Sequence, residues 1–95
     1  MSRLERNRNM DSRAFIVAAK TLIGKIEDTH NTIGTAEDLR NQREGLQKEV
    51  NQLFGGLQNP TLPSAYRLRE AAMRNGFFVD PKVLHRLAQF EYISG

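Results

Sequence analysis

The 95-residue chain contains no cysteine and no tryptophan, and it has only three prolines. Without cysteine it cannot form a disulfide, a thiolate metal site or a cysteine nucleophile, so its composition suits the cytoplasm or another reducing compartment. Its longest unbroken apolar run, 14–19, is far shorter than the ~20 residues of a membrane-spanning helix. No segment alternates apolar and polar residues as a strand does. These absences favour an all-α protein that does not enter a membrane.

Two amphipathic runs of similar length occupy most of the first 57 residues. Their apolar residues recur at spacings of three and four, which places them on one face of a helix. The first face holds Phe15, Ala19, Leu22, Ile23 and Ile26, and the second holds Leu46, Val50 and Leu53. The first face is too broad for the second, narrower stripe to cover, and Arg43 interrupts that stripe. We therefore expect a second body, either the C-terminal segment or another chain, to pack on the first helix.

The segment 31–34 separates the two runs and is rich in poor helix formers. Thr35 and Asp38, just after it, resemble a capping box at the start of the second helix. We predict helices over about 12–30 and 35–54, folded into a long antiparallel hairpin that is coiled-coil-like and dimerises.

A single long helix is the alternative, because the heptad phase does not break between Phe15 and Leu57. In that case the chain would have to dimerise to cover its apolar seam.

The remaining boundaries between segments are predicted from where arginine, glycine and proline residues lie in the chain. Residues 1–11 are Arg-rich and lack apolar periodicity, so we predict a flexible basic arm. The hairpin then spans 12–57, and a proline-containing linker spans 58–63. The segment 64–95 is predicted to hold two short helices that pack on the hairpin.

The two short helices have their own start and stop signals. Ser64 is the expected N-cap of a helix over about 65–75, and Gly76 is expected to end it in a left-handed conformation. Asp80 followed by Pro81 marks the start of a helix over about 81–93. The apolar Phe77 and Phe78 between these helices are predicted either to plug the open side of the first helix or to form a contact patch for a partner.

No catalytic or ligand-binding motif of comparable strength is present. Glu27 and His30 have the spacing of two metal ligands on a helix, but the second such pair that a di-metal site needs is missing. The serines lie in caps or tails, and the carboxylates are scattered along outer faces. We therefore expect no enzyme activity, no cofactor, no metal and no small-molecule substrate.

Basic residues cluster toward the two ends of the chain. Candidate phosphate contacts are Arg3, Arg6, Arg8, Arg67, Arg69, Arg74, Lys82 and Arg86. The last two helices loosely resemble a helix-turn-helix, although their turn is longer than that motif normally uses.

The sequence therefore predicts a small protein-interaction module: a regulator, inhibitor, adaptor or assembly factor that acts through an exposed apolar helix face, most simply as a homodimer. The eight residues of the two apolar faces are the expected interface. A nucleic-acid-binding regulator is the alternative, and a structural subunit of a larger assembly is a further one.

Overall fold

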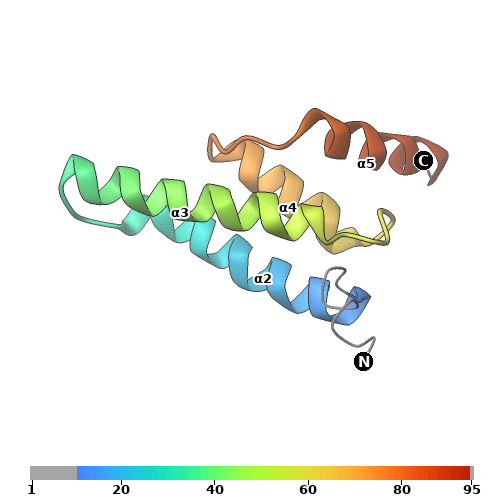
Figure 1. The fold of residues 1–95 in the computed structure, drawn as a ribbon, viewed down its shortest axis with the longest axis horizontal. Coiled ribbons are helices and arrows are strands. Elements are labelled where there is room, and N and C mark those ends of the chain that lie inside the picture. Colours follow the sequence, from blue (N-terminus) through green and yellow to red (C-terminus); the bar gives the residue numbers. More distant parts are fainter. Residues whose placement is uncertain (1–10, 95) are drawn as a thin grey trace, which may run out of the picture.

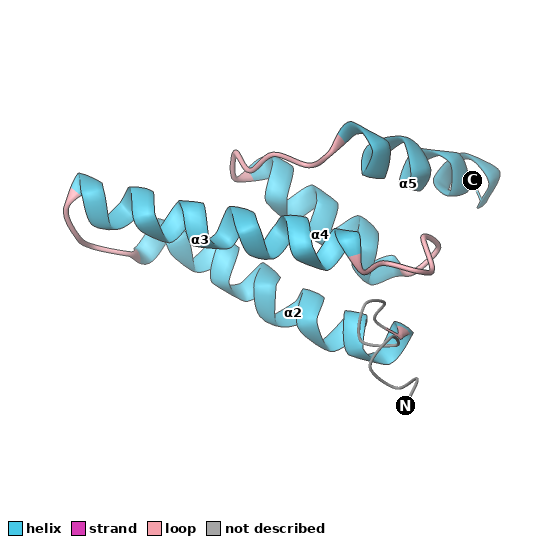
Figure 2. Ribbon diagram, viewed as in Figure 1, coloured by secondary structure: helices cyan, strands magenta, loops and turns pink. Residues whose placement is uncertain are grey.

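The computed structural model describes residues 11–94, and the side chains of residues 11–90. Within that range the only regular secondary structure is helical, and no strand is present. The helices are α2 (Ser12–Asp28), which the short 3-10 helix η1 (Thr29–Asn31) extends, α3 (Ala36–Gly55), α4 (Pro63–Arg74) and α5 (Pro81–Ser94) (Figures 1 and 2). The all-α class and the four helices expected from the sequence are confirmed.

Local hydrogen bonds explain where α2 and α3 begin. The Asp11 carboxylate accepts a hydrogen bond of 2.8 Å from the Ala14 amide, and this interaction caps α2. At α3 the Thr35 hydroxyl accepts from the Asp38 amide while the Asp38 carboxylate accepts from the Thr35 amide, which completes the predicted capping box. Residues 32–35 are not helical, so the alternative of one long helix is wrong.

The start of α4 differs from the expectation. The helix begins at Pro63, with Leu62 as its N-cap residue, whereas the sequence predicted a Ser64 cap and a start at 65. Proline suits the first helical position because that residue has no intrahelical partner for an amide hydrogen. Ser64 is buried within the first turn. At α5 the expected start at Pro81 holds, and the Asp80 carboxylate accepts from the Lys82 amide.

Helix α2 is central to the packing. It makes its most extensive contact with α4 and a smaller one with α3, and α5 packs against α4. Figure 1 shows α2 and α3 meeting at the 32–35 turn, with α4 and α5 toward the other end of α3. The predicted hairpin, with α2 and α3 as the main pair, is not confirmed, because the closest neighbour of α2 is α4.

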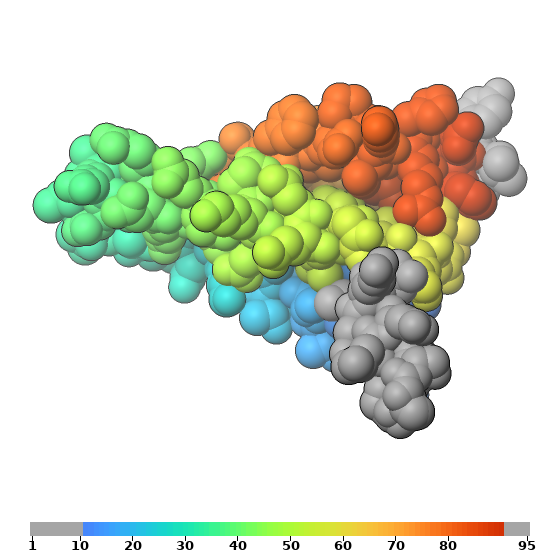
Figure 3. Space-filling view, in the orientation of Figure 1, coloured from blue at the N-terminus to red at the C-terminus, as the bar shows by residue number. Residues whose placement is uncertain are grey.

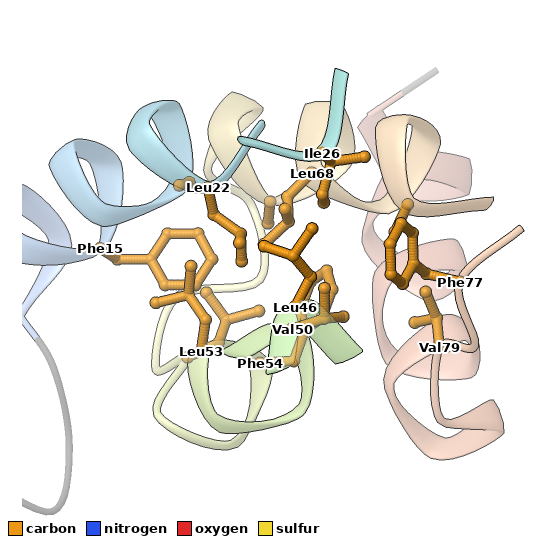
Figure 4. Close-up of a cluster of buried hydrophobic side chains, with 14 of the residues drawn as sticks. Phe15, Leu22, Ile26, Leu46, Val50, Leu53, Phe54, Leu68, Phe77 and Val79 are labelled. Atoms are coloured by element: carbon orange, nitrogen blue, oxygen red, sulfur yellow. The ribbon is translucent and has the colours of Figure 1, made fainter. Parts of the chain in front are cut away.

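The hydrophobic core lies where α2, α3 and α4 meet. Phe15 and Phe54 contact each other with ring centroids 6.5 Å apart, and this contact joins the start of α2 to the end of α3. Phe77 and Val79, from the connector between α4 and α5, belong to the same core (Figure 4). The connector is therefore part of the packed structure, and its conformation depends on α2, α3 and α4.

Of the described elements, α2, η1 and α3 form one narrow end of the molecule (Figure 3). Ile33, in the turn at this end, is 98% exposed.

Candidate interaction surface

The most distinctive surface lies at the turn between α4 and α5. Asn75 ends α4, and Gly76 adopts a φ of 83°, a left-handed conformation that glycine enters without a steric penalty. The Phe77 amide then donates a 2.8 Å hydrogen bond to the Ala72 carbonyl, which closes the turn. The next two side chains have opposite environments: Phe77 is 5% exposed and Phe78 is 60% exposed.

Arg43 of α3 holds this turn in place. Its guanidinium carbon lies 4.2 Å from the centroid of the Phe77 ring, and Nη2 donates a 3.1 Å hydrogen bond to the Asn75 carbonyl. A cation–π contact of this kind contributes about 0.5–2 kcal/mol, depending on its exposure. A Cβ atom at Gly76 would lie only 3.2 Å from the same Nη2 atom. The arginine that interrupts the apolar stripe of α3 therefore serves as the docking point for the connector.

Gln47, one turn further along α3, fixes the backbone of Phe78. Its Oε1 accepts a hydrogen bond from the Phe78 amide and its Nε2 donates one to the Phe78 carbonyl, both at 2.8 Å. The same Nε2 also donates to Asn51 Oδ1 at 3.0 Å, which restrains the rotamer of the glutamine. Both backbone groups of Phe78 are thus satisfied by α3, while its ring extends into solvent.

Asn75 connects three helical elements through its own polar groups. Its side-chain Nδ2 donates a 2.7 Å hydrogen bond to the Ala71 carbonyl, and this bond orients Oδ1 toward His30 Nε2 of η1. Because Oδ1 only accepts, His30 Nε2 must carry the hydrogen. With the bond from Arg43 to its carbonyl, Asn75 joins η1, α3 and α4 at one point.

An open groove lies beside this turn. Its lining residues are Arg40, Arg43, Glu44, Gln47, Gly76 and Phe77. The groove thus has an apolar wall at Phe77 and charged groups of both signs, and the exposed Phe78 follows Phe77 directly in the chain. We call this groove together with Phe78 the Phe78 surface.

The residues that the sequence predicted as an interface lie elsewhere. Those buried in the core of the single chain are Phe15, Ala19, Leu22, Ile26, Leu46, Val50 and Leu53. Ile23 is partly buried and packs against the same core. Because α4 packs on α2 and the seven buried side chains are at most 6% exposed, these seven offer almost no surface for a partner in the folded chain. Of the two bodies that the sequence allowed on this face, the C-terminal segment is the one that packs there, so the seven buried residues are core residues and not the exposed interface that the sequence predicted.

No described interaction brings the residues predicted to contact nucleic acid together in one basic surface. Arg3, Arg6 and Arg8 lie outside the described residues. Arg86 is used structurally, since it donates two 3.1 Å hydrogen bonds to carbonyl oxygens of the segment 57–58.

The other four lie on α4 and α5. Arg69 lies over the ring of Tyr66, and Arg74 forms a 3.4 Å ion pair with the glutamate one turn earlier. Arg67 and Lys82 are exposed.

Sequence reasoning identified neither Gln47 nor Asn75 as important. The usable signals were the arginine within the apolar stripe of α3 and the pair of phenylalanines in a connector. Neither signal identified the residue that would pack against it. The sequence allowed both phenylalanines to pack against the first helix. Phe77 does join the core, whereas Phe78 is exposed and does not plug the open side of that helix.

Comparison with known proteins assigns no family to this fold. No family model, curated protein or solved structure matches the chain. Between residues 11 and 94, no helix combines the length and the apolar character needed to cross a membrane. In the part of the chain that the structure describes, no three histidine, aspartate or glutamate side chains are grouped so that they could hold a metal ion.

Proposed function

We propose that this chain is a small, non-enzymatic protein-interaction module that binds a protein partner through the Phe78 surface. Such a module acts as a regulator, inhibitor, adaptor or assembly factor. The observation that carries the proposal is the combination at Phe78 of a ring that is 60% exposed with a backbone held by two hydrogen bonds from Gln47. Aromatic side chains on restrained backbones are typical anchors of protein interfaces.

The energetics favour such an anchor. Burying the exposed part of one phenylalanine side chain contributes about 1–2 kcal/mol, and contacts with a shaped pocket add to this value. Because the Phe78 backbone is already ordered in the free chain, binding does not have to order it, and less conformational entropy is lost. The adjacent charged side chains of Arg40 and Glu44 supply polar contacts at the rim of the same surface.

Self-association through the broad face of α2 is not part of this proposal, because that face is buried in the single chain. A second copy of the chain is one partner that the Phe78 surface could accept. Light scattering of the purified chain distinguishes this case from a different partner.

The test compares two exposed apolar residues with the same exposure. Phe78→Asp places a charge on the proposed anchor, and Val17→Asp, on α2, is the matched control because Val17 is also 60% exposed. Affinity capture from the native host, or light scattering if the partner is a second copy, should show loss of the partner with Phe78→Asp and retention with Val17→Asp. Circular dichroism checks that both variants fold. Equal capture by both variants would contradict the proposal.

A further inference from the structure

The turn that presents Phe78 contains an asparagine followed by a glycine, at Asn75 and Gly76. In this dipeptide the deprotonated glycine amide nitrogen can attack the asparagine side-chain carbon Cγ, because glycine has no side chain to hinder the approach. A Cγ–N bond forms, the Cγ–Nδ2 bond breaks and ammonia leaves, which produces a five-membered succinimide. Water then opens the succinimide at either carbonyl to give aspartate or isoaspartate.

The backbone conformation of the folded chain prevents this ring closure. The five-membered ring requires the Gly76 nitrogen to be nearly eclipsed with Cβ of Asn75. Asn75 has a ψ of 11°, which turns the Gly76 nitrogen well away from Cβ. The attack therefore needs a large rotation about ψ, and this rotation would break the turn that ends α4.

Hydrogen bonds hold both reacting groups in this inert arrangement. The nucleophile, the Gly76 amide, donates to the Met73 carbonyl at 3.2 Å. The electrophile, the Asn75 amide group, is held at Oδ1 by His30 and at Nδ2 by the Ala71 carbonyl. The Asn75 carbonyl itself accepts from Arg43, which opposes rotation about ψ directly.

We propose that Asn75 is a latent deamidation site that the folded chain keeps inert, and that opening of the 71–78 turn makes it reactive. The hydrogen bonds from His30 to the Asn75 side chain and from Arg43 to the Asn75 carbonyl are the restraints that keep this turn closed. Reaction then proceeds from the small fraction of molecules in which this turn is locally open.

The products of deamidation destabilise the native turn. An aspartate at position 75 has no Nδ2 hydrogen for the Ala71 carbonyl, and it places a negative charge at the C-terminal end of α4, where the helix dipole is unfavourable for anions. An isoaspartate adds a carbon to the main chain and displaces Gly76 from its register against Arg43. Deamidation therefore loosens the turn that carries Phe77 and Phe78, because the hydrogen bond from Asn75 Nδ2 to the Ala71 carbonyl is lost.

The first measurement needs no variant. Deamidation at Asn75 is followed by peptide mapping and mass spectrometry in the folded chain and in the same chain unfolded in urea, at one mildly alkaline pH. The folded chain should react at least about tenfold more slowly, because only its open fraction reacts. Equal rates in the two states would overturn the proposal.

The second measurement tests the restraints one at a time. His30→Ala and Arg43→Ala should each accelerate deamidation of the folded chain about fivefold, the factor that corresponds to one net hydrogen bond of about 1 kcal/mol. Arg40→Ala is the matched control, since it removes an exposed arginine one turn away on the same helix. If both variants react no faster than Arg40→Ala, these restraints do not protect Asn75. The assay uses the purified chain alone, so its outcome is independent of whether Phe78 binds a partner.

Discussion

Adjacent phenylalanines with opposite burial provide a sharp test of the fold around the connector. Phe77 lies in the core beneath the Arg43 guanidinium, whereas the ring of Phe78 is largely in solvent. Replacing a buried phenylalanine with alanine costs about 3–5 kcal/mol, through lost burial and the cavity that remains. Phe77→Ala also removes the cation–π contact with Arg43. The same change at Phe78 should alter the free energy of unfolding by no more than about 0.5 kcal/mol.

The loss expected for Phe77→Ala is large relative to the total free energy of unfolding. A chain of 95 residues is expected to have a free energy of unfolding of roughly 5–14 kcal/mol. Phe77→Ala should therefore remove a large fraction of it and lower the melting temperature by more than about 10 °C. Phe78→Ala should lower the melting temperature by less than about 4 °C.

Urea and thermal unfolding, followed by far-ultraviolet circular dichroism, measure both quantities. The two variants differ from each other only in which of two neighbouring residues is shortened, so each is the control for the other. If Phe78→Ala proves as destabilising as Phe77→Ala, then Phe78 is buried and the environments assigned to the two rings are wrong. If neither variant loses stability, the connector does not pack on α3 as described.

Three further substitutions test local features of the helices. Thr35→Ala removes the capping box of α3 and should cost about 1 kcal/mol, or roughly 4–8 °C in melting temperature; an unchanged melting temperature would contradict this assignment. Gly24→Ala, in the exposed interior of α2 with open space around its Cβ position, should stabilise the chain by about 0.5–1 kcal/mol. Gly76→Ala should instead destabilise it by at least about 1 kcal/mol in urea unfolding, because of the positive φ and the contact with Arg43; equal effects at the two glycines would refute this distinction.

The helix boundaries could be predicted from the sequence because they depend on neighbours three or four positions away. The Thr35 capping box, the Gly76 stop and the start at Pro81 all involve such local interactions. The misplaced start of α4 has the same local origin: Pro63 and Ser64 are both acceptable start signals, and the chain uses the proline.

The candidate site could be predicted only in part. The unusual residues of the region, Arg43 in an apolar stripe and the Phe77–Phe78 pair, were visible in the sequence. The contacts that define the site join residues that are distant in the chain: Gln47 and Phe78 are separated by 31 positions, and Arg43 and Asn75 by 32. Periodicity carries no information about such pairs.

The sequence by itself determined that this protein is all-helical, where most of its helices begin, and that α2 carries a broad apolar face, because spacing and capping are properties of short segments. The tertiary structure alone decided that α4 covers that face, that Arg43 receives Phe77, and that Phe78 is left in solvent. An apolar face must be buried, but any apolar neighbour of suitable shape can bury it. Only the packing of the whole chain selects among them.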